Sequence, residues 1–272
     1  MSETSALWLR VAAALYSIGL LYALITLTQA RRHLFRIALG AFGVGGLFHL
    51  VSIVDQGVAS GRLPAGNIFE TLSLCAFALT VFFLAASWKY PLESLSTFIF
   101  PLVFMMTTAA ALSTPIGNWA SPAARSYWLI AHVVAALLSY AALTFTAVAA
   151  MLYLYQERRL KQKKPAAWSG RIPPLGTLDD LISKSIAFGF ACVSAGILAG
   201  TIWAFIEFGT GWVTNPSIGM GFVTWAIYLA MVFLRVSAGW RGRKAAVMAL
   251  IALCCSALTW VAHARLEYML PQ

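Results

Sequence analysis

Charged residues are scarce in this chain, and their scarcity excludes most classes of soluble protein. Only 10% of the 272 residues are Asp, Glu, Lys or Arg, whereas 61% are apolar. A soluble domain carries about 25% charged residues, because its surface must face water. Strands of about ten residues with alternating polarity, which are typical of a membrane β-barrel, are also missing. The sequence therefore predicts an all-α protein that spans a membrane.

The motifs of soluble enzymes are missing as well. The chain has no P-loop, no nucleophile elbow, no G-x-G-x-x-G after a strand and no H-E-x-x-H. Its four cysteines lie in apolar runs without a C-x-x-C pair, so we interpret them as packing residues. The net charge of +10 comes from basic residues in short loops, which does not indicate nucleic-acid binding. We do not expect an enzyme in its own right.

Long apolar segments are what the sequence has in abundance. A helix needs roughly 20 mostly apolar residues to cross a bilayer, where every backbone polar group must be paired internally. Together the segments predict a polytopic membrane helix bundle of about eight transmembrane helices, forming a single transmembrane domain over residues 1–272, with the first span retained rather than cleaved. The segments are Ala6–Thr28, Ile37–Asp55, Ile68–Ser87, Leu95–Ser113, Tyr127–Tyr155, Leu181–Ile206, Met220–Val236 and Ala245–Ala262.

The basic residues predict the orientation of the bundle. Of the 19 Lys and Arg residues, fifteen lie within residues 31–36, 88–94, 156–184 and 235–244, which are alternate connections between the spans. The remaining four lie on the other side. Basic connections stay in the cytoplasm, so both termini are predicted to face outward (N-out/C-out).

Three histidines lie at similar depth in the outer half of the predicted bundle: His49, His132 and His263. An ionisable side chain inside a membrane span is costly to bury, so each is a functional candidate. Any one of them alone is more often a hydrogen-bonding residue between helices. Three on one side favour a cofactor site instead, and imidazole is a common axial ligand of haem iron.

Aromatic and acidic residues also gather on the outer side. Trp203 and Trp212 bracket a Gly-rich connection, where they are typical either of an interfacial belt or of aromatic faces lying against a macrocycle. Glu70 begins a predicted helix, so we expect it to complement the helix N-terminus or to pair with Arg62 or Arg125.

Several segments resemble the cytochrome c assembly protein family, the CcsA/HemX-like membrane proteins. They read LPAGNIFETL at residues 63–72, SYWLIAHVVAALLSYAAL at 126–143, TLDDLISKSIAFGF at 177–190, AGILAGTIWA at 195–204, TWAIYLAMVFLR at 224–235 and GWRGRKAA at 239–246. The resemblance implies a multi-pass protein of the bacterial inner (cytoplasmic) membrane that handles haem at its outer face in c-type cytochrome biogenesis. It implies that His132 and His49 bind haem iron, and that His263, Trp203, Trp212 and Glu70 contact the cofactor.

The same resemblance implies partners. Besides the lipid bilayer, these are apocytochrome c and a CcsB/ResB-like partner subunit, so the chain would be a component of a cytochrome c haem lyase system. The alternative within the family is a HemX-like regulatory or scaffolding protein linked to haem biosynthesis. A small-solute transporter has only the polytopic architecture in its favour, and the lack of charged residues in mid-membrane argues against it.

One part of the chain departs from the family pattern. The family's WWD loop reads W-G-x-Y-W-x-W-D-P-K-E-x-W, whereas residues 208–220 read FGTGWVTNPSIGM. Gly209, Trp212 and Pro216 are kept, but the other tryptophans and the charged residues are replaced. Phe233 also stands where the family has a histidine. The sequence therefore predicts a degenerate WWD loop over residues 203–220.

Overall fold

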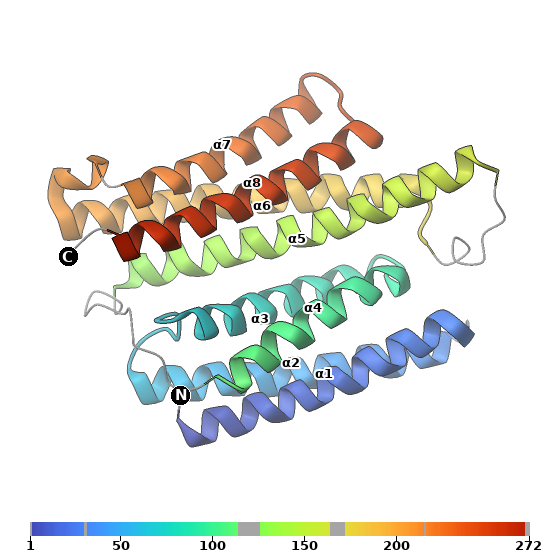
Figure 1. Ribbon diagram of the computed structural model, residues 1–272, viewed down its shortest axis with the longest axis horizontal. Helices are drawn as coiled ribbons and strands as arrows, with labels where there is room; N and C mark the ends of the chain where they lie inside the picture. The colour runs from blue at the N-terminus through green and yellow to red at the C-terminus, as the bar shows by residue number, and fades with distance from the viewer. Residues whose placement is uncertain (1, 30–31, 114–125, 164–171, 215, 270–272) are drawn as a thin grey trace. The chain divides into compact units, whose positions relative to one another are not determined.

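The described chain is helical throughout. The computed structural model describes residues 2–29, 32–113, 126–163, 172–214 and 216–269, although not the side chains of residues 27–32, 212–218 and 259–269. Eight α-helices and one 3-10 helix occupy this part of the chain, and it contains no β-strand (Figure 1). The predicted all-α fold is confirmed.

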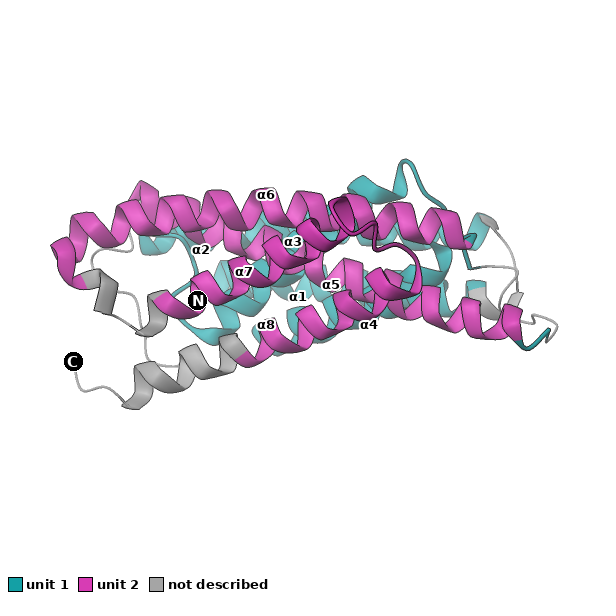
Figure 2. Cartoon of the chain, turned by 90° about the horizontal axis from the view of Figure 1, so that it is seen from above, with its two compact units in different colours: residues 1–125, 162–174 teal, residues 126–161, 175–272 magenta. Residues whose placement is uncertain are grey.

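The chain divides into two compact units, which Figure 2 shows in different colours. Unit 1 comprises residues 1–125 and 162–174, and unit 2 comprises residues 126–161 and 175–272. The predicted extent of a single transmembrane domain, residues 1–272, remains a prediction. The units are described separately below.

Unit 1 contains four helices, in which α1 (Glu3–Gln29) lies against α2 (Arg32–Ser60) and α4 (Glu93–Ala111), and α3 (Ile68–Ser87) lies against α2 and α4. Their shared core is aromatic. Phe42 stacks on Phe100 with ring centroids 3.8 Å apart, and Phe83 meets the Phe100 ring edge-on at 5.1 Å. All three side chains are fully buried. Offset and edge-to-face ring pairs add to the burial of large apolar surface, so these rings hold three helices together.

Unit 2 contains the longest helices, α5 (Tyr127–Lys161) and α6 (Leu175–Phe208), which lie side by side. The 3-10 helix η3 (Gly209–Thr214) follows α6, and α7 (Pro216–Val236) and α8 (Arg243–Met269) complete the unit. The buried Tyr228 hydroxyl of α7 donates to the Ser139 carbonyl of α5 at 2.6 Å. This bond ties α7 to α5 across the interior of the unit.

Within the described residues, seven helices are long and apolar enough to cross a membrane, so the protein is a multi-pass membrane protein. The eighth, α8, has described side chains only as far as Leu258. The predicted spans match the helices in number and order, but several ends differ. α5 continues through the basic run to Lys161, where Lys161 pairs with Glu157 at 2.8 Å, and α6 begins six residues earlier than predicted.

The connection predicted as a Gly-rich outer loop is largely helical, and the prediction of a loop was wrong in this respect. α6 extends to Phe208, η3 follows without a break, and α7 begins at Pro216. Proline suits the first position of a helix, because its missing N–H would have no partner there. Short 3-10 segments commonly continue a helix end in this way.

Candidate functional site

His132 projects from α5 into α6. Its Nδ1 atom lies 2.8 Å from the carbonyl oxygen of Gly196. A carbonyl oxygen can only accept a hydrogen bond, so Nδ1 carries the proton of the neutral ring and Nε2 keeps its lone pair. The side chain is half-buried, and Nε2 has no hydrogen-bond partner among the described residues. A carbonyl that fixes the tautomer in this way is typical of a histidine that binds a metal through its other nitrogen.

Gly200 allows the imidazole to approach α6 so closely. A Cβ atom at position 200 would lie 2.5 Å from Nδ1 and 2.9 Å from Cε1 of His132. Gly196 and Gly200 are four residues apart and therefore share one face of the helix. They form a G-x-x-x-G pattern, which is typical of membrane helices whose backbones pack closely. The His132 ring therefore occupies space that a side chain at position 200 would fill.

Trp203 lies one turn further along α6 than Gly200. Its indole Nε1 is buried and has no hydrogen-bond partner in the described part of the chain. The ring meets Phe208 edge-on, with centroids 5.6 Å apart. An unpaired buried N–H costs about 1–3 kcal/mol, so this donor calls for an acceptor that the described residues do not supply. Among the described residues of unit 2, His132 on α5 thus keeps an imidazole lone pair and Trp203 on α6 keeps an unpaired indole donor.

Two further predicted residues lie outside the described side chains. Trp212 is in η3, and His263 is in the second half of α8. Their roles remain predictions. Among the described residues, no group of three or more His, Cys, Asp and Glu side chains could hold a metal ion.

His49 lies in unit 1 and is fully buried. Its Nδ1 is 3.2 Å from the Tyr16 hydroxyl, and its Nε2 is 2.8 Å from the Ser73 hydroxyl. Thr80 donates to the same Tyr16 oxygen at 3.2 Å. The network links α1, α2 and α3, and it leaves neither imidazole nitrogen free. Ligation of iron by His49 remains a prediction, and it would require one of these two bonds to open.

Glu70 connects the start of α3 to the preceding loop. The expected pair with Arg62 is confirmed: Arg62 Nη1 lies 3.1 Å from Glu70 Oε2, and both side chains are largely buried. Gly66 N–H also donates to Oε2 at 2.7 Å, while the Asn67 side chain caps the helix by accepting from Glu70 N–H at 2.9 Å. The carboxylate is therefore engaged by the loop, and a contact between Glu70 and a cofactor remains a prediction.

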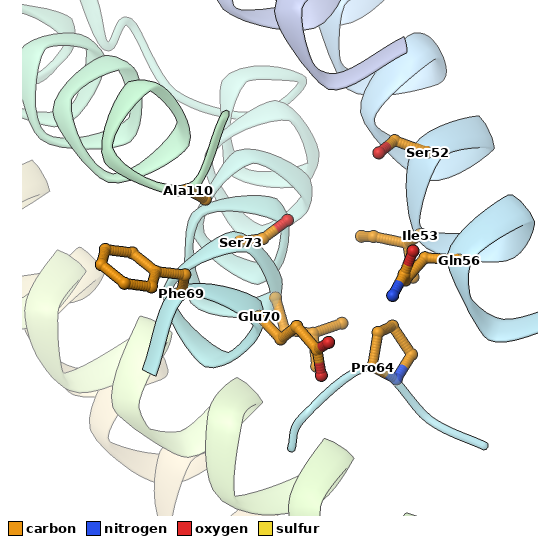
Figure 3. A pocket seen from close by; sticks show the side chains of 9 residues that line it. Ser52, Ile53, Gln56, Pro64, Phe69, Glu70, Ser73 and Ala110 are labelled. Carbon is orange, nitrogen blue, oxygen red and sulfur yellow. The ribbon is translucent and has the colours of Figure 1, made fainter. Parts of the chain in front are cut away.

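A small cavity lies beside Glu70, and Figure 3 shows its lining side chains. Its volume is about 20 Å³. One water molecule fits a space of this size, whereas sites for drug-sized ligands occupy about 300–1,000 Å³. The cavity is therefore of a size for water and not for a porphyrin. Its lining residues are Ser52, Ile53, Gln56, Pro64, Phe69, Glu70, Ser73, Leu74 and Ala110.

The predicted residues thus form two groups. His49 and Glu70 are linked in unit 1 through Ser73, which follows Glu70 by one turn of α3 and bonds to His49. His132 and Trp203 both lie in unit 2, on the neighbouring helices α5 and α6. The polar side-chain atoms of His49 and Glu70 have partners within the chain, whereas His132 Nε2 and Trp203 Nε1 have none among the described residues.

Sequence reasoning missed an ion pair at the opposite end of unit 2. Arg235 Nη2 lies 2.8 Å from Asp179 Oδ2, and Arg235 Nε donates to Ser183 at 2.8 Å. Asp179 Oδ1 also accepts from Gly242 N–H at 2.9 Å. The sequence did contain a signal for this ion pair, because Asp179 and Arg235 both lie at the predicted cytoplasmic face of the membrane. These bonds of Arg235 and Asp179 join the start of α6 to the end of α7 and to the turn between α7 and α8.

Comparison with known proteins identifies the class to which this arrangement belongs. The family model described as "Cytochrome C assembly protein" matches residues 65–263, which include His132, Trp203 and Glu70. The chain is thus a multi-pass helical membrane protein of the cytochrome-assembly class. It belongs to the cytochrome c assembly protein family, and its function lies in c-type cytochrome biogenesis.

Individual relatives agree with the family match. A protein named "Cytochrome c biogenesis protein CcsA" from Synechococcus sp. (strain RCC307) is 30% identical over 219 residues, covering 71% of this chain and 70% of the relative. Proteins of the same name from Prochlorococcus marinus subsp. pastoris and Guillardia theta are 27% and 24% identical, covering 75% and 93% of this chain and 72% and 88% of the relatives. These names favour the first predicted function, and they give the HemX-like alternative no support.

A solved structure shares the fold. "Cytochrome c Heme Lyase CcmF" aligns with a TM-score of 0.64 at 15% sequence identity, covering 96% of this chain. The chain spans about half, 51%, of the length of that protein. At this identity the likeness supports the fold alone.

Proposed function

We propose that this protein binds haem at the outer face of the membrane and holds it for the assembly of c-type cytochromes, with His132 as a ligand of the iron. The observation that carries the proposal is the tautomer of His132, which the Gly196 carbonyl sets so that Nε2 is left with a lone pair. Membership of the cytochrome c assembly protein family supports it.

The described residues of unit 2 fit a haem group in three ways. His132 offers an imidazole lone pair, and Gly200 leaves room for that ring beside α6. Trp203 offers an unpaired N–H for an acceptor such as a propionate, together with an aromatic face. Bound haem would supply the iron and the vinyl groups to which a cytochrome becomes attached. The chain's own part is to orient the group and to keep the imidazole in one tautomer.

The remaining partners follow from the same proposal. Apocytochrome c would receive the haem, and a CcsB/ResB-like subunit would complete a cytochrome c haem lyase system, so that the chain is a component of that system and no enzyme alone. We also propose a location in the bacterial inner membrane, and the basic connections support an orientation with the haem side outward. The names of the CcsA relatives support this role. His49, His263, Trp212 and Glu70 are proposed further contacts.

An absorption spectrum of the full-length protein from haem-replete cells tests the proposal. We expect a Soret band that falls at least fivefold in His132→Ala, because a single strong iron ligand is lost. His33→Ala is the matched control, since His33 is an exposed histidine on the predicted cytoplasmic side, and it should keep the band. Added imidazole should restore the band in His132→Gly, because it can replace the missing ring. A colourless wild-type protein, or an unchanged band in His132→Ala, would refute the proposal.

A further inference from the structure

The turn between α7 and α8 can be followed in Figure 1. It forms one side of an open groove of about 410 Å³. Two cations, Arg243 and Lys244, line this groove together with the Trp240 ring. Apolar side chains of both helices complete the lining, among them Leu234 and Ile251. The groove therefore combines a basic end with an apolar floor.

The turn that carries this basic end has a fixed conformation. Gly239 and Gly242 have φ angles of +63° and +58°, which side chains other than glycine rarely adopt. Trp240 N–H donates to the Leu234 carbonyl at 3.1 Å, and Gly242 N–H donates to the Asp179 carboxylate at 2.9 Å. The backbone beside the two cations is thus held by α6 and α7, so the groove is formed without a ligand.

The charges of the groove are uncompensated. Three other basic residues of unit 2, Arg235, Lys184 and Lys161, pair with carboxylates 2.7–2.8 Å away. Arg243 and Lys244 are exposed and have no carboxylate partner among the described residues. Lys244 Nζ lies 5.7 Å from the centroid of the Trp240 ring, which leaves its charge available to an anion.

We propose that this groove binds an anionic phospholipid, with the phosphate between Arg243 and Lys244 and an acyl chain along Leu234, Val247 and Ile251. The two unpaired cations complement a phosphate, and the apolar floor complements a hydrocarbon chain. The two cations lie near the end of α7 that the basic connections place on the cytoplasmic side, where anionic headgroups are found. Tryptophan, here Trp240, is typical of the membrane–water interface. A free phosphate would leave the apolar floor without a ligand. The proposal does not depend on haem binding.

Native mass spectrometry of the full-length protein, released from nanodiscs of equal parts phosphatidylglycerol and phosphatidylcholine, tests the site. We expect the ratio of retained phosphatidylglycerol to phosphatidylcholine to fall about thirtyfold in R243Q/K244Q, since two cations near a headgroup, at about 1 kcal/mol each, together contribute about 2 kcal/mol. R36Q/K89Q is the matched control, because it removes two exposed cations of unit 1 from the same predicted side, and the ratio should change less than twofold. R243K/K244R keeps both charges and should keep the ratio.

Three results would overturn the proposal. An equal fall in R36Q/K89Q would show general attraction to the net charge rather than a site. Displacement of the lipid by inorganic phosphate or glycerol 3-phosphate in excess would assign the cations to a free phosphate. A change in oligomeric state of R243Q/K244Q with unchanged lipid retention would assign the groove to a second copy of the chain.

Discussion

The His132 site makes a prediction that leaves the histidine itself untouched. Gly200→Ala adds one methyl group where the ring now lies, 2.5 Å from Nδ1 and 3.1 Å from Cγ. These distances are shorter than any ordinary contact, so either the imidazole or the two helices must move. If the ring moves, its hydrogen bond to the Gly196 carbonyl is lost, and Nε2 is no longer held in one orientation.

The magnitude follows from three contributions. Overpacking a tight interior by one methyl group costs about 1–3 kcal/mol. Loss of the hydrogen bond costs about 0.5–1.5 kcal/mol. Replacing glycine by alanine within a helix stabilises the helix by about 1 kcal/mol. We therefore expect a net loss of about 0.5–3.5 kcal/mol in the free energy of unfolding, and a haem affinity lower by about tenfold, because the lost bond is worth up to about 1.4 kcal/mol.

The assay pairs thermal unfolding in detergent with a haem titration that follows the Soret band. Two variants of α6 are graded controls. At Gly176 an added Cβ would have no neighbour within 4 Å, and at Gly196 it would make only ordinary contacts, the nearest at 3.5 Å. Gly176→Ala should bind haem like wild type and be at least as stable, because it gains helix propensity without a steric cost, and Gly196→Ala should lie between it and Gly200→Ala in both measurements. If folded Gly200→Ala binds haem as tightly as Gly176→Ala, the glycine does not position the imidazole and the reasoning fails.

Two further predictions concern unit 1, both measured by unfolding in detergent. Ser73→Ala removes the hydroxyl that bonds His49 Nε2, so we expect a loss of about 1–3 kcal/mol from the unpaired buried nitrogen; stability equal to wild type would contradict the network. Glu70→Gln should cost about 3–5 kcal/mol, because it removes the carboxylate that compensates the largely buried Arg62 charge. Glu70→Gln with Arg62→Gln should cost less than Glu70→Gln alone, and an additive double variant would argue against a coupled pair.

Much of the fold could be predicted because lipid restricts the choices. Apolar runs of span length can only be helices in a bilayer, so the helices match the prediction in number and order. Their ends could not be placed from hydropathy, since polar residues continue a helix beyond the hydrocarbon. For this reason α6 begins at Leu175 rather than at Leu181. The additional turns of α6 include Asp179, which forms the ion pair with Arg235.

The site was predictable in part. The pair of Glu70 with Arg62 was among the expectations, together with a pair with Arg125 and a role at the helix N-terminus, and the structure selects Arg62. The packing of the His132 ring beside Gly200 was not predicted. The Gly196-x-x-x-Gly200 pattern does indicate a face of α6 where another helix can approach closely. Which face of α5 meets those glycines depends on packing and not on composition. Whether the indole N–H of Trp203 finds an acceptor depends on every side chain around that ring, so no pattern in the sequence could predict that it is unpaired among the described residues.

The two candidate histidines with described side chains differ in whether a ring nitrogen is free to bind a metal. A neutral imidazole has one N–H and one lone pair. His132 donates its N–H to a carbonyl and keeps the lone pair, whereas both nitrogens of His49 are engaged by hydroxyl groups. Iron binding at His49 must first break a bond to Tyr16 or Ser73, and binding at His132 breaks none. We therefore expect His132→Ala to remove more haem than His49→Ala, and the opposite order in matched preparations would show that the buried network opens more readily than its hydrogen bonds imply.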